Sequence, residues 1–216
     1  MRIHLRTVVM MVMVLGLTLA GSAAAAEKGG VDLDGAALLV IDIQNFYFPG
    51  GQMPLVGPEE AATKAAELVA CFRAVGRPVI WVQHLPKDVD TPDPTGIAEE
   101  YRMRPNLLPA QGEVVIGKHY ANSFGDTDLQ AVLQRMGIKK LVICGMQTHM
   151  CVEAAVRAAA DLGYEVTVAH DACATRDLEF NGVKVPAAQV HAAALAAMEY
   201  AYAKVESVDE LCGGAK

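Results

Sequence analysis

A cysteine placed where a loop turns into a helix is the strongest sign of chemistry in this sequence. Cys151 follows the apolar run 141–144 and Gly145, and it precedes the alanine-rich stretch 152–162, which favours a helix closed by Gly163. A thiol at a helix N-terminus lies near the positive end of the helix dipole and near unpaired N–H groups, both of which favour the thiolate. We therefore predict that Cys151 is a nucleophile with a lowered pKa. A small buried structural cysteine is the alternative.

A carboxylate and a lysine are predicted at the ends of two other strands. Asp42 closes the apolar run 36–43, and Lys118 follows the short apolar run 113–116. Since ligands of an open parallel sheet bind at the carboxyl ends of its strands, these side chains and Cys151 are expected near one edge, with Asp42 facing a wet cleft. The carboxylate would accept the thiol proton, and the ammonium would stabilise both anions. A turn-capping aspartate and a solvated lysine are the alternatives.

The order of predicted elements alternates between strand and helix. Strands are predicted at 36–43, 78–83, 113–116, 141–144, 165–169 and 204–207, and helices at 58–75, 126–136, 152–162 and 186–202. Residues 84–112 form a long loop with one helical turn at 97–101, and loops of that length are usually functional. The pattern predicts a single α/β domain: three α/β/α layers around a six-stranded, mainly parallel sheet of Rossmann-like type.

The first 26 residues have the pattern of a signal peptide: a basic start, an apolar core and a small-residue cleavage site after Ala26. The mature domain is therefore expected to span 27–216 and to be exported, as a periplasmic or secreted protein. Loss of Arg2 and Arg6 leaves 16 basic against 25 acidic residues, so the net charge moves from −7 to −9. This balance argues against nucleic acid, and against the membrane after signal cleavage, as partners.

Three segments resemble the isochorismatase-like cysteine hydrolase superfamily, which includes nicotinamidases, N-carbamoylsarcosine amidases and isochorismatases. They are LLVIDIQNFY, VIGKHYANSFGDTDL and LVICGMQTHMCVEAAVRAAADLGYEVTVAHDACAT, and the resemblance runs from about 36 to 207. It implies the isochorismatase-like fold, with Cys151 as nucleophile, Asp42 as proton acceptor and donor, and Lys118 supporting both. It also implies a cis peptide between Met146 and Gln147, with the N–H groups of Gln147 and Cys151 forming an oxyanion hole.

Departures from the family pattern narrow the expected substrate. Nicotinamidases carry an Asp-x-His metal motif after the second strand, whereas this chain has Gln83-His84-Leu85-Pro86 there, so no metal and no cofactor are expected. The cysteine favours hydrolysis of a C–N bond in a small amide, imide or carbamoyl substrate through a thioester. The alternatives are hydrolysis of an isochorismate-type vinyl ether, or a non-catalytic small-ligand-binding or thiol-sensing protein. The resemblance also implies a homo-oligomer.

Several other side chains near the strand ends are candidates. We expect the substrate to contact Gln44, Phe48, Trp81, His84, Tyr120 and Phe124. His149 is an alternative base for Cys151, and His84, His119 and His149 are an alternative metal set. With five cysteines, at least one thiol is outside any intrachain disulfide. A disulfide between Cys144 and Cys173 is one alternative, and Cys71 and Cys212 give no functional signal.

Overall fold

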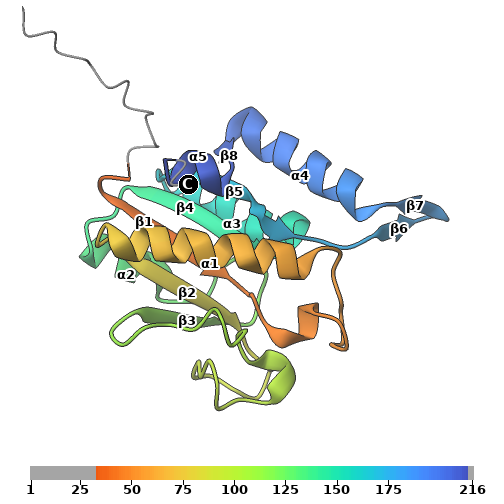
Figure 1. Ribbon diagram of the computed structural model, residues 1–216, viewed down its shortest axis with the longest axis horizontal. Coiled ribbons are helices and arrows are strands. Elements are labelled where there is room, and N and C mark those ends of the chain that lie inside the picture. The colour runs from red at the N-terminus through yellow and green to blue at the C-terminus, as the bar shows by residue number, and fades with distance from the viewer. Residues whose placement is uncertain (1–32, 214–216) are drawn as a thin grey trace, which may run out of the picture.

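The computed structural model describes residues 33–213, so the predicted signal peptide lies outside the described residues. A six-stranded parallel sheet has the order β3-β2-β1-β4-β5-β8 and is covered by helices on both sides (Figure 1). Its strands are β1 (Ala36–Ile41), β2 (Val79–His84), β3 (Val114–Lys118), β4 (Lys140–Met146), β5 (Glu165–Ala174) and β8 (Lys204–Glu206). The helices are α1 (Pro58–Ala74), α2 (Leu129–Arg135), α3 (Glu153–Asp161), α4 (Ala187–Ala201) and α5 (Val208–Leu211). The predicted three-layer α/β fold is confirmed.

The strand order reverses between β1 and β4, and this reversal positions the site. The chain moves from β1 to β2 in one direction along the sheet and from β4 to β5 in the other. Because such crossovers are right-handed, α1 and α3 cover opposite faces of the sheet. All six residues of β1 are buried, which explains its continuous apolar sequence. The crevice at the carboxyl ends of β1 and β4 is where this architecture binds ligands.

Gly145 allows the backbones of β1 and β4 to approach closely at this reversal. Its φ is 132°, and a Cβ atom there would collide with the carbonyl oxygen of Ile41. The pairing of β4 with β5 also shifts register between Ile143 and Gly145. The glycine therefore fixes how the end of β1, which leads to Asp42, lies against the loop that leads to Cys151.

The structure contains a hairpin and a final helix that the sequence analysis did not predict. Strands β6 (Leu178–Phe180) and β7 (Val183–Val185) form an antiparallel arm that projects beyond the N-terminal end of α4 (Figure 1). Asn181 and Gly182 have φ values of 50° and 78°, as a tight hairpin turn requires. No helix among residues 33–213 is long and apolar enough to cross a membrane.

The disulfide in the structure joins the two cysteines for which the sequence analysis found no functional signal. Cys71 of α1 is bonded to Cys212, which follows α5, with 6.0 Å between their Cα atoms. Cys144 and Cys173, the pair left open above, are both reduced and buried. The bonded cysteines are 141 positions apart, so only the packing of α5 against α1 brings them together.

Candidate active site

Asp42 lies directly after β1 in a strained backbone conformation. Its φ is 51°, in the left-handed region that costs a non-glycine residue about 1–2 kcal/mol. The turn is held because the Asp42 N–H donates to the carbonyl of Val82 (3.0 Å), while the Asp42 carbonyl accepts from the N–H of Gln44 (2.9 Å). The carboxylate is fully buried, which corrects the expectation of a wet cleft.

Lys118 connects the carboxylate to the thiol. It ends β3, two strands away from β1, and its long side chain reaches back across the end of β2. The ammonium lies 2.6 Å from the nearer carboxylate oxygen of Asp42, and it donates to the sulfur of Cys151 (3.3 Å) and to the carbonyl of Tyr120 (3.1 Å). The structure thus brings Asp42, Lys118 and Cys151 into one group, called the triad below.

Cys151 lies within a π-helical turn, η3 (Thr148–Val152), which continues into α3. The N–H groups of Met150 and Val152 both donate to the carbonyl of Gln147, at 3.0 and 3.2 Å. The peptide bond between Met146 and Gln147 is cis, as the resemblance implies. The nucleophile therefore lies two residues before the regular helix α3, which begins at Glu153, one residue later than the sequence analysis predicted.

The electrostatics of the triad correct the expectation of a low thiol pKa. Burial and the nearby Asp42 carboxylate raise the pKa of Cys151 to about 12, and Lys118 offsets this only in part. Burial alone would lower the pKa of Lys118, but the Asp42 carboxylate and the Cys151 sulfur outweigh it and raise that pKa. The resting site therefore holds an aspartate–lysine ion pair beside a neutral thiol. The Asp42 Oδ1 atom is buried and has no hydrogen-bond donor among the described residues, so it can accept the thiol proton.

Brief treatment of the native protein with iodoacetamide is expected to label Cys151 before any other residue. Cys144 and Cys173 are buried, Cys71 and Cys212 are disulfide-bonded, and Cys151 lines the cavity described below. Because the pKa of Cys151 is raised, its labelling rate should climb by up to about tenfold per pH unit between pH 6 and 9. Mass-spectrometric mapping at several pH values measures both. A rate already level at pH 7, or labelling led by Cys144 or Cys173, would contradict this.

Cys151 of the triad lines a cavity of about 330 Å³, called the active-site cavity below. Twelve residues line it: Phe46, Tyr47, Gln52, Met53, His84, Tyr101, Ala121, Gln147, His149, Met150, Cys151 and Arg176. Its volume suits a small molecule. Of the side chains predicted to contact the substrate, His84 lines this cavity.

Five other predicted substrate contacts do not line the cavity. They are Gln44, Phe48, Trp81, Tyr120 and Phe124. The fully buried amide of Gln44 donates to the carbonyls of His84 (2.9 Å) and Tyr101 (2.6 Å) and accepts from the His84 N–H (2.8 Å). Gln44 therefore holds the residues that form the cavity wall, although its own side chain is not part of that wall.

Three of the four aromatic side chains in that group contact residues elsewhere, and the fourth is exposed. The buried Trp81 ring donates from its Nε1 to Glu113 (2.7 Å), and the Arg104 guanidinium lies 4.2 Å from the ring centre of Phe48. Phe124 packs near Tyr164, and Tyr120 is exposed. Position near a strand end therefore did not determine the direction of these side chains.

Most of the cavity wall was not predicted, because it comes from segments between the regular elements. Phe46 and Tyr47 belong to the short 3₁₀ helix η1 (Asn45–Tyr47), and Tyr101 ends another, η2 (Glu99–Tyr101). Gln52, Met53, Ala121, Met150 and Arg176 complete the residues that the sequence analysis missed. The one signal available was the length of the loop 84–112, which pointed to a functional segment and contains Tyr101.

The candidate histidines do not form a metal site. In the part of the chain that the structure describes, no three His, Cys, Asp or Glu side chains are grouped to hold a metal ion. His149 lies in η3, and its Nδ1 is 2.5 Å from the hydroxyl of Thr175. No hydrogen bond joins His149 to Cys151 within residues 33–213, whereas Lys118 contacts the thiol directly.

Activity on a confirmed substrate is expected to survive treatment with EDTA. Segment 83–86 lacks the Asp-x-His pattern, and the described histidines are not grouped with other metal-binding side chains. Turnover measured before and after chelation and desalting tests this. Loss of activity that added zinc or manganese restores would show that the role of His84 or His149 had been misjudged.

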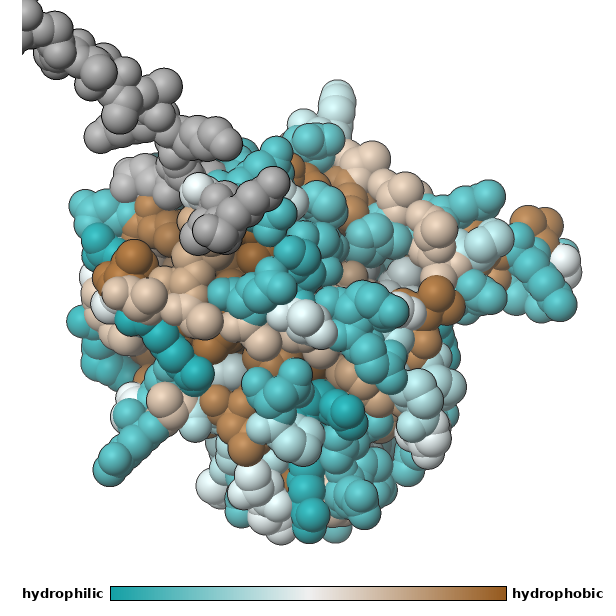
Figure 2. All heavy atoms as spheres, in the orientation of Figure 1, coloured by the Kyte–Doolittle hydropathy of each residue, from teal (hydrophilic) through white to brown (hydrophobic). Residues whose placement is uncertain are grey.

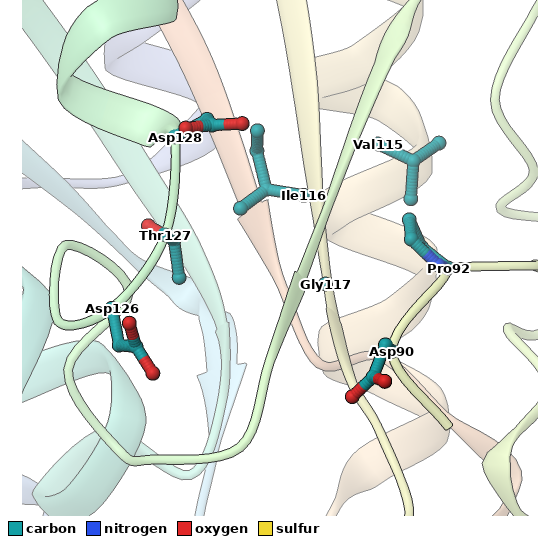
Figure 3. A pocket seen from close by; sticks show the side chains of 8 residues that line it. All are labelled: Asp90, Pro92, Val115, Ile116, Gly117, Asp126, Thr127 and Asp128. Atoms are coloured by element: carbon teal, nitrogen blue, oxygen red, sulfur yellow. The ribbon is translucent and has the colours of Figure 1, made fainter.

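A second hollow, of about 470 Å³, lies against β3 at the edge of the sheet. Figure 3 shows Asp126 and Asp128 on the segment that leads into α2, and Asp90 on a separate segment across the strand. This hollow contains none of the triad residues. The chemistry described above is therefore confined to the active-site cavity.

Known hydrolases resemble the chain over most of its length. Streptothricin hydrolase from Streptomyces noursei is 34% identical over 66% of this chain and 50% of its own length. Ureidoacrylate amidohydrolase from Methylorubrum extorquens is 30% identical over 61% of this chain and 66% of its own length. Both of these relatives are hydrolases by name, which supports hydrolysis at the level of the family.

Closer similarities include one curated protein and one solved structure. The isochorismatase family protein YddQ of Bacillus subtilis (strain 168) is 46% identical over 80% of this chain and 96% of its own length. The crystal structure of an isochorismatase hydrolase from Oleispira antarctica has a TM-score of 0.77 and 53% identity, covering 83% of this chain and 96% of that one. The isochorismatase domain model matches residues 36–210. On this evidence the chain belongs to the isochorismatase family.

Proposed function

We propose that the protein is a cysteine hydrolase that cleaves the C–N bond of a small amide, imide or carbamoyl substrate through a thioester. The observation that carries the proposal is the buried triad, in which one ammonium contacts both a carboxylate and a thiol at the cavity. A ligand-binding or thiol-sensing protein would not require a carboxylate paired in this way beside the thiol.

In the acylation step, the sulfur of Cys151 attacks the substrate carbonyl carbon while the thiol proton passes to Asp42. This transfer avoids a thiolate beside an ionised carboxylate, which the raised pKa of Cys151 shows to be unfavourable. The negative charge moves to the carbonyl oxygen, where the N–H groups of Gln147 and Cys151 are proposed to donate to it. The C–N bond then breaks as Asp42 returns its proton to the leaving nitrogen.

In the deacylation step, water attacks the thioester and gives a proton to Asp42. The C–S bond breaks, the carboxylic acid product forms, and the proton on Asp42 returns to the sulfur, which restores the resting thiol. Lys118 is protonated in the resting site, because the Asp42 carboxylate and the Cys151 sulfur raise its pKa. It thereby keeps Asp42 oriented toward the thiol.

A hydrolysis screen over small amides, imides, carbamoyl compounds and isochorismate tests the proposal. We expect release of ammonia or an amine from at least one C–N compound, together with an acyl adduct on Cys151 in the intact-protein mass spectrum. The control is Cys151→Ala, which should have no activity. Activity retained by that variant would overturn the thioester route, and turnover of isochorismate alone would favour the vinyl ether alternative.

We further propose that the mature chain is exported and forms a homo-oligomer. The Cys71–Cys212 disulfide supports export, because such bonds persist in oxidising compartments. Apolar residues appear along α4 and on the β6–β7 arm (Figure 2), where Phe180, Val183 and Tyr200 are exposed. Cell fractionation tests the first proposal, and light scattering of the purified protein tests the second.

A further inference from the structure

The active-site cavity carries one positive charge that no other group in its wall balances. Among the residues that the structure describes, those lining the cavity include no carboxylate, and Arg176 is the one arginine or lysine. Beneath the cavity, the Asp42 carboxylate and the Lys118 ammonium compensate each other at 2.6 Å. The whole chain has a net charge of −7, so a cationic cavity is not a consequence of composition.

The other titratable side chains in the wall are neutral near pH 7. Burial lowers the pKa of His84, and burial together with the Arg176 guanidinium lowers the pKa of His149. Burial, the Asp42 carboxylate and the Cys151 sulfur raise the pKa of Tyr47 far above its ordinary value, so its hydroxyl keeps its proton. The guanidinium of Arg176 therefore carries the net positive charge of the cavity wall, and the Tyr47 hydroxyl is a neutral hydrogen-bond donor.

Arg176 is held at the cavity by a fixed backbone. The preceding residue, Thr175, is buried, accepts from the N–H of Val56 (2.8 Å) and has its hydroxyl 2.5 Å from His149. The following residue, Asp177, accepts from the N–H of Ala187 at the start of α4 (2.7 Å). The Arg176 side chain is exposed, and no carboxylate in residues 33–213 forms an ion pair with it.

We infer that Arg176, assisted by the hydroxyl of Tyr47, binds a carboxylate group on the substrate. Arginine presents a planar set of donors that matches a carboxylate, and the apolar side chains of the cavity wall would contact the carbon chain. This inference rests on the proposed function for the scissile bond. It narrows the substrate class to small amide, imide or carbamoyl compounds that carry a carboxylate.

Two alkylating reagents of nearly the same shape test this inference without a known substrate. Iodoacetate carries a carboxylate, whereas iodoacetamide is its neutral counterpart, and both react with the thiol of Cys151. Each rate is divided by the rate of free cysteine with the same reagent. We expect the corrected ratio of iodoacetate to iodoacetamide to be above one in the wild type, and to fall by roughly tenfold in Arg176→Gln.

Matched variants separate a local contact from general electrostatics. Arg135→Gln removes an exposed arginine on α2 outside the cavity and should leave the ratio unchanged. Arg176→Lys keeps the charge but loses the planar donors, so it should retain part of the preference. Tyr47→Phe should reduce the preference less than Arg176→Gln. Equal ratios in the wild type and Arg176→Gln would overturn the inference.

A binding experiment keeps this inference distinct from the proposed function. Succinate is titrated calorimetrically into Cys151→Ala, which lacks the thiol, and into the same variant with Arg176→Gln. We expect succinate to bind the first and not the second, and the neutral succinamide to show no such difference. Absence of succinate binding to Cys151→Ala would overturn the carboxylate subsite. An unreactive Cys151 with succinate binding intact would instead overturn the thioester mechanism alone.

Discussion

Replacing Asp42 with asparagine is expected to reduce kcat/KM on a confirmed substrate by about 10³–10⁴-fold, near the upper end for loss of a general base. The amide keeps the shape of the carboxylate but can neither accept the thiol proton nor return it to the leaving nitrogen, and burial, the largest cause of the raised pKa of Cys151, persists in the variant. Steady-state kinetics measures this loss. Near-wild-type turnover would show that the triad is wrong and would make His149 the next candidate base.

The same substitution is also expected to destabilise the fold. Asp42 and Lys118 are both fully buried, so the asparagine leaves the ammonium without its counter-charge, at a cost of about 3–5 kcal/mol. Urea unfolding measures the free energy. The matched control is Asp42→Asn combined with Lys118→Met, which removes both charges and should regain most of the stability without regaining activity. An inactive but stable double variant separates the chemical role of Asp42 from its structural role.

Replacing Lys118 with methionine is expected to lower kcat/KM by about 10²–10⁴-fold at pH 7, for a different reason. Lys118 lowers the pKa of Cys151 and pairs with the Asp42 carboxylate, so its loss raises the pKa of Cys151 further and leaves the carboxylate without its partner. More thiolate forms as the pH rises, and the variant should therefore recover part of its rate between pH 7 and 9.

Comparison of the two variants over pH tests this difference. The Asp42→Asn variant lacks the proton acceptor at every pH, so we expect its deficit to stay nearly constant over the interval in which Lys118→Met recovers. Both variants must first be shown to be folded at each pH by circular dichroism. Parallel pH–rate profiles for the two variants would contradict separate roles for the carboxylate and the ammonium.

The sheet and the triad were predictable because each depends on a simple sequence pattern. Fully buried strands give continuous apolar runs, and the carboxyl ends of parallel strands meet at one edge, which places Asp42, Lys118 and Cys151 near each other. The hairpin was also predictable in principle, since Asn181-Gly182 is a strong turn signal. It was missed because each strand has only three residues.

The cavity wall and the thiol pKa depend on tertiary packing, which local patterns do not contain. Trp81 lies within β2 and points to Glu113, while Tyr101 reaches the cavity from a loop far along the chain. The helix start suggested a low pKa for Cys151, but burial beside the Asp42 carboxylate has the larger effect. That burial exists only once β1, β3 and η3 have come together.

The bond between Cys71 and Cys212 makes most of the domain a covalent ring. The ring encloses Lys118 and Cys151, while Asp42 lies on the segment that enters it. A single protease cut in the mostly exposed stretch 87–96 would therefore leave one covalently joined molecule, heavier only by the water used in hydrolysis, until a reductant was added. In an environment rich in proteases, Asp42 and Cys151 would stay covalently joined after such a cut. Without the disulfide, the same cut would leave them on two separate chains.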